Sequence, residues 1–186
     1  MIAVPTDTEP PTDIAYRNGL PAFQFLLLRL LPVLTLGLGF TLLSTISLAQ
    51  PLILTIKGVA PQDVSFTLSE LQALPSDKVT TETIWTDTPH TYTTVSFKTL
   101  FEHLKSDPKG KTLTMVALND YFIKVEIDTL IEHNAFIAYA MDGKKMRIRD
   151  KGPLWVLYPF SDKPAINIPP FQAHSIWQLK AIILNP

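Results

Sequence analysis

Residues 113–130 read LTMVALNDYFIKVEIDTL, and this stretch decides most of what the sequence says about the fold. The segments Thr112–Leu118 and Phe122–Ile127 are rich in β-branched residues and bounded by turn-forming residues, which is typical of strands. Only three residues, Asn119-Asp120-Tyr121, separate them. The stretch therefore predicts two strands joined by a tight connection.

Capping residues and apolar periodicity predict the elements on either side. Thr67 and Glu70 have the spacing of a capping box, which predicts a short helix over Leu68–Leu74. Ser96 and Asp128 are candidate caps of two further helices. The first of these carries an apolar stripe at helical spacing, formed by Phe97, Leu100, Phe101 and Leu104.

The remaining apolar runs predict strands at Leu52–Ile56, Val79–Trp85, Phe136–Met141, Lys145–Arg149, Leu154–Tyr158 and Ile176–Leu184. Asp142-Gly143 is the strongest hairpin signal, because a two-residue turn of that twist needs positive φ angles. Strands alternate with short helices, and no helix is long enough for a doubly wound sheet. The sequence therefore predicts an α+β fold with mixed or antiparallel sheets.

The composition excludes several classes of protein. The chain has 186 residues, 46% apolar and 18% charged, which does not fit a disordered or collagenous protein. Its 16 Lys and Arg against 17 Asp and Glu argue against a nucleic-acid partner, which requires a basic surface. With no cysteine, the chain cannot carry a thiol nucleophile, an iron–sulfur cluster or a metal held by a protein thiolate.

Apolar residues concentrate in Leu26–Leu48, which only Arg29 interrupts with a charge. The core of this run has the length of a signal-peptide apolar region, and Ser47-Leu48-Ala49 matches the small-x-small cleavage pattern before Gln50. An uncleaved membrane anchor is the alternative, because the run approaches the roughly 20 residues that span a bilayer.

The chain is therefore expected to have three parts. Residues 1–25 are interpreted as a disordered leader, residues 26–49 as the signal peptide or anchor, and residues 50–186 as one exported domain. Under either interpretation the domain is expected to be periplasmic or exported, and an uncleaved segment would anchor it to the inner membrane.

The search for catalytic motifs is negative. His90, His103, His133 and His174 have no metal-ligand spacing and are interpreted as ordinary histidines. Lys145, Arg147, Arg149 and Lys151 would lie on one face of a strand, either as an anion site or as a solvated hairpin face. Aromatic residues such as Trp85 and Trp177 are either packing residues or the lining of a cleft.

Five segments, taken in order, resemble the oxidoreductase molybdopterin-binding domain family, which has the sulfite-oxidase-like fold. They are Ser96–Leu104, Leu113–Leu130, Ala135–Met146, Lys151–Phe160 and Ser175–Leu184. The resemblance covers most of residues 79–184 and implies that fold for residues 50–186. It also implies a molybdenum ion held by a cysteine, in the loop that here reads TETIWTDTPHTY, Thr81–Tyr92.

This chain departs from the family at that position, because it has no cysteine. A threonine hydroxyl is a hard, weakly acidic ligand and does not replace a soft thiolate. The segment Ser161–His174 offers one lysine, Lys163, for the pterin pyrophosphate that the enzymes bind. We therefore expect an accessory binding module without a cofactor and without catalytic residues. A molybdopterin-dependent oxidoreductase with other ligation is the alternative.

The resemblance also predicts a binding site in the former pterin cleft. The expected ligand is small and anionic or aromatic, or the site receives a membrane-associated protein partner. Aromatic side chains would supply flat contact area and Arg149 a fixed cation. The expected lining residues are Trp85, Asp87, His90, Tyr121, Arg149, His174 and Trp177.

Overall fold

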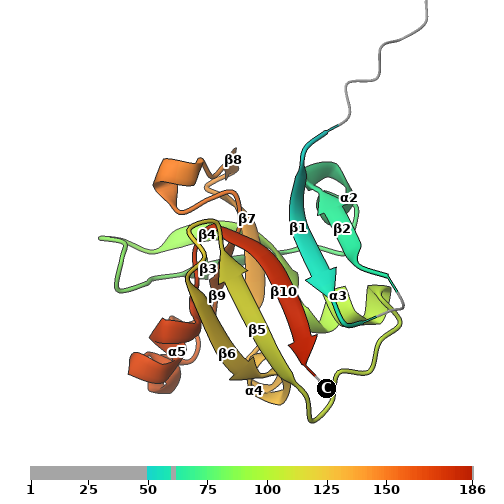
Figure 1. Ribbon diagram of the computed structural model, residues 1–186. Helices are drawn as coiled ribbons and strands as arrows, with labels where there is room; N and C mark the ends of the chain where they lie inside the picture. The colour runs from blue at the N-terminus through green and yellow to red at the C-terminus, as the bar shows by residue number, and fades with distance from the viewer. Residues whose placement is uncertain (1–49, 60–61, 186) are drawn as a thin grey trace, which may run out of the picture. The chain divides into compact units, whose positions relative to one another are not determined.

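The computed structural model describes residues 50–59 and 62–185 (Figure 1). The predicted leader and the predicted signal or anchor segment lie outside the described residues. Within the described ranges, no helix combines the length and the apolar character that a membrane span needs. The described residues have the predicted class, α+β, with one mixed and one antiparallel sheet and short helices.

The first sheet has five strands in the order β2-β1-β10-β5-β6. The strands are β1 (Leu52–Lys57), β2 (Val64–Thr67), β5 (Thr112–Ala117), β6 (Phe122–Glu126) and β10 (Leu179–Asn185). Strands β1 and β10 pair in parallel, and the other neighbours are antiparallel. The predicted connection of Asn119, Asp120 and Tyr121 is confirmed as the hairpin turn between β5 and β6.

The second sheet is antiparallel and has β7 at its centre. Its strands are β3 (Asp77–Thr81), β4 (His90–Ser96), β7 (Phe136–Met141), β8 (Lys144–Lys145) and β9 (Trp155–Leu157). Strand β4 pairs with one edge of β7, while β8 and β9 share the other edge. The predicted Asp142-Gly143 turn is confirmed between β7 and β8, with φ angles of 50° and 74°.

Short helices connect these strands. They are α2 (Leu68–Gln72), α3 (Phe97–His103), α4 (Ile127–Glu132), α5 (Pro169–His174) and the 3₁₀ turns η1 (Ile148–Asp150) and η2 (Pro164–Ile166). The capping box of Thr67 and Glu70 is confirmed, and Ser96 caps α3 by accepting from the Thr99 amide. The prediction for Asp128 is wrong: Glu126 occupies the cap position of α4, and the Asp128 carboxylate accepts from the Gly110 amide instead.

Two apolar clusters bury both faces of the second sheet. The larger contains residues of both sheets together with α3 and α4, and Tyr158 belongs to it. The smaller lies on the opposite face of β7 and β9 and includes Tyr92, Met146 and Trp155. Trp155 and Tyr158 have opposite strand parity, and both are almost fully buried because each faces a different cluster.

The predicted strand Lys145–Arg149 is wrong, and with it the expectation of four cations on one strand face. Strand β8 ends at Lys145, and the chain turns into η1. The Gly152 amide donates to the Arg147 carbonyl, which closes a compact turn instead of extending the hairpin. The Arg147 guanidinium reaches the Asp150 carboxylate of the same turn at 2.5 Å.

Two other predicted strands are shorter by three residues or more at one end than expected. The strand expected over Val79–Trp85 ends at Thr81, and the strand expected over Ile176–Leu184 begins at Leu179. Strands β2 and β4 and helix α5 were not predicted. These differences matter for function, because Trp85 thereby lies in a turn, and Trp177 lies before β10 with an isolated bridge to Trp155.

Candidate functional site

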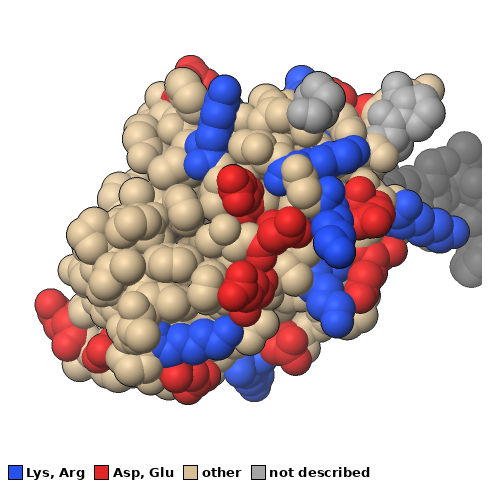
Figure 2. All heavy atoms as spheres, turned by 90° about the horizontal axis from the view of Figure 1, so that it is seen from below, with Lys and Arg blue, Asp and Glu red and all other residues tan. Residues whose placement is uncertain are grey.

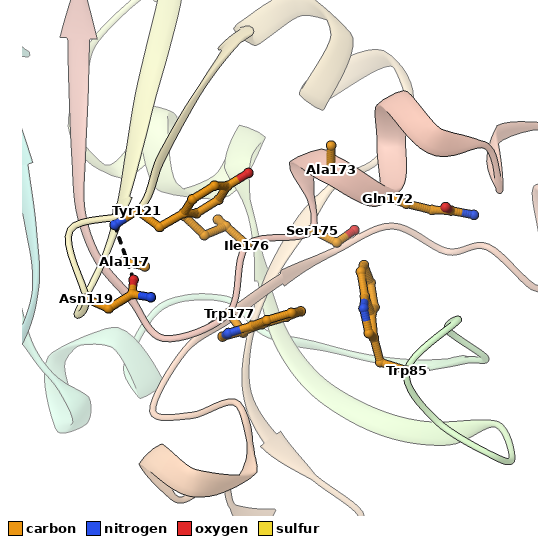
Figure 3. Close-up of a pocket in the computed structure, with 9 residues that line it drawn as sticks. All are labelled: Trp85, Ala117, Asn119, Tyr121, Gln172, Ala173, Ser175, Ile176 and Trp177. Atoms are coloured by element: carbon orange, nitrogen blue, oxygen red, sulfur yellow. Dashed lines mark hydrogen bonds between the residues drawn. The ribbon is translucent and has the colours of Figure 1, made fainter.

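A pocket of about 320 Å³ lies where three chain segments meet (Figure 3). The segments are the turn between β5 and β6, the loop after β3, and the connection from α5 to β10. The pocket is lined by Trp85, Ala117, Asn119, Tyr121, Gln172, Ala173, Ser175, Ile176 and Trp177. Its volume is at the lower end of the roughly 300–1,000 Å³ usual for small-molecule sites.

Three aromatic side chains give the pocket its apolar surface. The rings of Trp85 and Trp177 are nearly perpendicular, at 84°, with centroids 5.5 Å apart. Tyr121 is 52% exposed and Trp177 39%, so both rings present apolar surface to solvent beside the pocket. Trp85 also packs against the buried Trp155 at 5.9 Å, so that the second apolar cluster supports this wall.

Main-chain hydrogen bonds fix the segment that carries Trp177. The Gln178 carbonyl accepts from the Leu118 amide, and the Gln178 amide donates to the Lys151 carbonyl. The Trp155 indole donates to the Ser175 carbonyl at 3.1 Å. Because the segment is bonded to the β5–β6 turn on one side and to residues 151–155 on the other, the Trp177 ring is held on a rigid support.

The β5–β6 turn is fixed in the same way. The Asn119 side-chain oxygen accepts from the Tyr121 amide at 3.2 Å, and Asp120 has a φ of 65°. The Asp120 carboxylate pairs with Lys180 on β10 at 2.5 Å. Asn119 and Asp120 are well suited to this turn, since short polar side chains tolerate positive φ and bond the main chain two residues on.

Several polar side-chain atoms of the lining are already hydrogen-bonded within the protein. The Asn119 side-chain nitrogen points toward the open space in Figure 3, while its oxygen is used by the turn. The Gln172 side-chain nitrogen donates to Asn167, and the Ser175 hydroxyl donates to the Phe171 carbonyl. The lining set contains no Lys, Arg, Asp, Glu or His.

Three of the seven residues predicted for the site come together here, namely Trp85, Tyr121 and Trp177. His174 lies between the lining residues Ala173 and Ser175 in the chain, but its ring faces the Tyr158 hydroxyl at 3.1 Å. Burial lowers the pKa of His174, so its imidazole is neutral at pH 7 and adds no positive charge beside the pocket.

The other three predicted residues are not among those that line the pocket. His90 contacts the Asp142 carboxylate at 2.6 Å, and this hydrogen bond is the largest cause that lowers the pKa of Asp142. Asp87 is exposed in the loop after β3. Arg149 is exposed in η1, 4.0 Å from the Asp150 carboxylate. The pocket therefore lacks the cation that was expected to favour an anionic ligand.

The sequence did not nominate Asn119, Gln172 or Ser175 for the site. Asn119 stands in the quoted turn, so its position could have been found. Gln172 lies on α5, where no side chain caps the helix and the local start signal is the pair Pro169 and Pro170 in its first turn. Figure 2 shows charges of both signs interspersed over one side of the face seen from below, with an uncharged region on the other side.

Comparison with solved structures finds a distant structural match to this α+β architecture. The sulfane dehydrogenase SoxCD from Paracoccus pantotrophus superimposes with a TM-score of 0.53 and 14% sequence identity. The match covers 70% of this chain and 37% of that chain. No family model and no curated protein sequence matches this chain. At this identity the likeness shows the fold alone.

The residues of the pocket do not fit the cofactor that the fold type implies. No thiolate exists in the chain to hold molybdenum. No cation among the lining residues would neutralise the phosphate of a pterin cofactor, a charge that is costly to bury without a partner. Among the described residues, no group of three His, Asp or Glu side chains could hold a metal ion.

Proposed function

We propose that the chain is a non-catalytic binding module on a sulfite-oxidase-type fold. The aromatic pocket binds a small ligand or a segment of a protein partner in the place that a pterin occupies in the enzymes. The observation that carries the proposal is the rigidly supported pair of perpendicular rings, Trp85 and Trp177, beside an exposed Tyr121. Large exposed aromatic groups around a concave site are a mark of ligand or partner binding.

The alternative is a molybdopterin-dependent oxidoreductase in which a residue other than cysteine holds the metal. The uncharged lining and the missing thiolate both count against it. The alternative differs from the binding module in one property that can be measured directly, the metal content of the protein made in its own host.

Protein purified from its native compartment is expected to contain molybdenum far below one atom per chain, because no thiolate is present to hold it. It is also expected neither to oxidise sulfite nor to reduce sulfoxides. Elemental analysis and pterin fluorescence after oxidation measure the first expectation, using cells grown with added molybdate so that metal supply is not limiting. Stoichiometric molybdenum together with pterin fluorescence would establish the oxidoreductase and end the binding-module proposal.

We also propose that the module acts in the periplasm after removal of residues 1–49. The mature chain is expected to begin at Gln50, because Ser47 and Ala49 provide the small residues that signal peptidase recognises. Intact mass and amino-terminal sequencing of the exported protein test this expectation. A full-length species in the membrane fraction would show instead that Leu26–Leu48 is retained as an anchor at the inner membrane.

A further inference from the structure

The charge of the pocket limits the ligand to neutral molecules. None of the nine lining residues is ionisable near neutral pH, and the nearby His174 is held neutral by burial. The closest charged residue in the β5–β6 turn, Asp120, is paired with Lys180. A carboxylate or phosphate entering the pocket would lose hydration and gain no opposite charge in return.

The polar atoms of the pocket distinguish among neutral ligands. Its free nitrogen donors are the side-chain amide of Asn119 and the indole N–H groups of Trp85 and Trp177. None of these nitrogens bonds to another described residue. The Trp177 nitrogen lies at the end of its ring on the Asn119 side (Figure 3). The Tyr121 hydroxyl can donate or accept. A purely hydrocarbon ligand would leave these groups desolvated, whereas a ligand rich in hydroxyl groups would satisfy them.

The same donors argue against an organic cation. Aromatic rings attract quaternary ammonium groups through their faces. Here, however, the free side-chain groups of the lining are mostly N–H donors, which a cation cannot use, and no carboxylate among the lining residues balances its charge. A ligand must combine a flat apolar face for the rings with hydroxyl groups at its edge for the amide and indole nitrogens.

We propose that the pocket binds one ring of a neutral, β-linked oligosaccharide, an inference that rests on the proposed binding function. In a pyranose with equatorial substituents, the C–H groups form flat apolar faces and the hydroxyl groups lie around the rim. One such face stacks on Trp177 or Tyr121, and Asn119 donates to a hydroxyl at the rim. The exposure of Tyr121 and Trp177 leaves room for neighbouring sugars to extend into solvent.

Isothermal titration calorimetry of the purified protein with cellotetraose and with chitotetraose tests the proposal. Binding of at least one is expected at a Kd of micromolar to about 1 mM, since a single open site buries few groups. Sedimentation with insoluble cell-wall glycan distinguishes a polymeric source of the sugar from a free oligosaccharide. Absence of heat with both tetrasaccharides up to about 10 mM would overturn the proposal.

Three variants locate the site. Trp177→Ala is expected to weaken binding at least about tenfold, because it removes a stacking surface. Asn119→Asp keeps the oxygen that accepts from the Tyr121 amide but removes the donor, so affinity should fall about fivefold to tenfold with an unchanged melting temperature. Phe122→Ala is the matched control: it is 60% exposed and directly follows Tyr121, but it does not line the pocket, and its affinity should be unchanged.

The outcomes separate the sugar from the wider proposal. Equal losses of tetrasaccharide affinity in Trp177→Ala and Phe122→Ala would show that the pocket is not the sugar site and would overturn the inference. A second outcome is that the protein binds choline chloride more tightly than either tetrasaccharide and that Trp177→Ala abolishes this binding. That result would overturn the saccharide inference while leaving the binding-module proposal in place. The metal analysis above decides against the module itself.

Discussion

Trp155→Ala is expected to lower the free energy of unfolding by about 3–5 kcal/mol, the range for truncating a large buried aromatic side chain. Trp155 is 1% exposed and packs edge-on against both Tyr92 and Trp85, with centroids 5.9 Å away in each case. Its indole also donates to the Ser175 carbonyl, which would be left without that donor. Chemical denaturation followed by circular dichroism measures the loss, because tryptophan fluorescence changes with the substitution itself.

Trp177→Ala is the matched control for this stability measurement. Trp177 is 39% exposed, and its pairing with Trp155 in an isolated bridge uses main-chain atoms that alanine retains. We therefore expect a loss of no more than about 1 kcal/mol, as for other partly exposed positions. A loss as large as that of Trp155→Ala would show that the Trp177 ring is part of the core, and the pocket would then be no free binding surface.

Local signals were sufficient to predict several elements. The β5–β6 hairpin depends on two short β-rich runs and a turn with Asn119 and Asp120, all within fifteen consecutive residues. The start of α2 depends on Thr67 and Glu70, three residues apart. In each case the hydrogen bonds that define the turn or the cap lie within the segment itself, so the sequence pattern and the structure agree.

Long-range contacts explain where the predictions failed. The strand that forms β3 was expected to continue to Trp85, but the chain leaves the sheet after Thr81. There the Thr81 hydroxyl accepts from the Ser161 amide, and the Glu82 amide donates to the Ser161 hydroxyl. These partners are about eighty residues apart, so no pattern within residues 79–85 reveals them. The result moves Trp85 out of the sheet and toward the pocket.

The residues predicted for the site fall into two groups. The resemblance predicts that Trp85, Tyr121 and Trp177 lie around one concave site, and all three line the pocket. Arg149 belongs to an alternating basic run that predicts a strand, and the resemblance predicts that this basic hairpin lies at the same cleft. The basic run instead folds back as η1, and this turn brings Met146 close to Gly152. Alternation of charge alone could not distinguish these two conformations.

That close approach leads to the second large effect. Gly152→Ala is expected to lower the free energy of unfolding by about 2–3 kcal/mol, in the range for overpacking a buried site. A Cβ at Gly152 would overlap the Met146 carbonyl oxygen and lie 2.7 Å from the Met146 Cβ. Neither atom is the end of a flexible side chain. Met146 is 7% exposed and belongs to the same cluster as Trp155, so it cannot move aside without disturbing that cluster.

Gly143→Ala is the uncrowded comparison for this substitution, because its new methyl group adds the strain of positive φ without any close contact. Gly143 has a φ of 74° and open space around a new Cβ, so about 1–2 kcal/mol is expected there. The Gly152 substitution should also weaken ligand binding. The Gln178 side chain donates to the Ile148 carbonyl and its amide to the Lys151 carbonyl, so a shifted turn would move the support of Trp177. Thermal denaturation and calorimetry of both variants measure the two effects, and a Gly152→Ala protein as stable as the unsubstituted protein would show that residues 146–152 relax freely around the new methyl group.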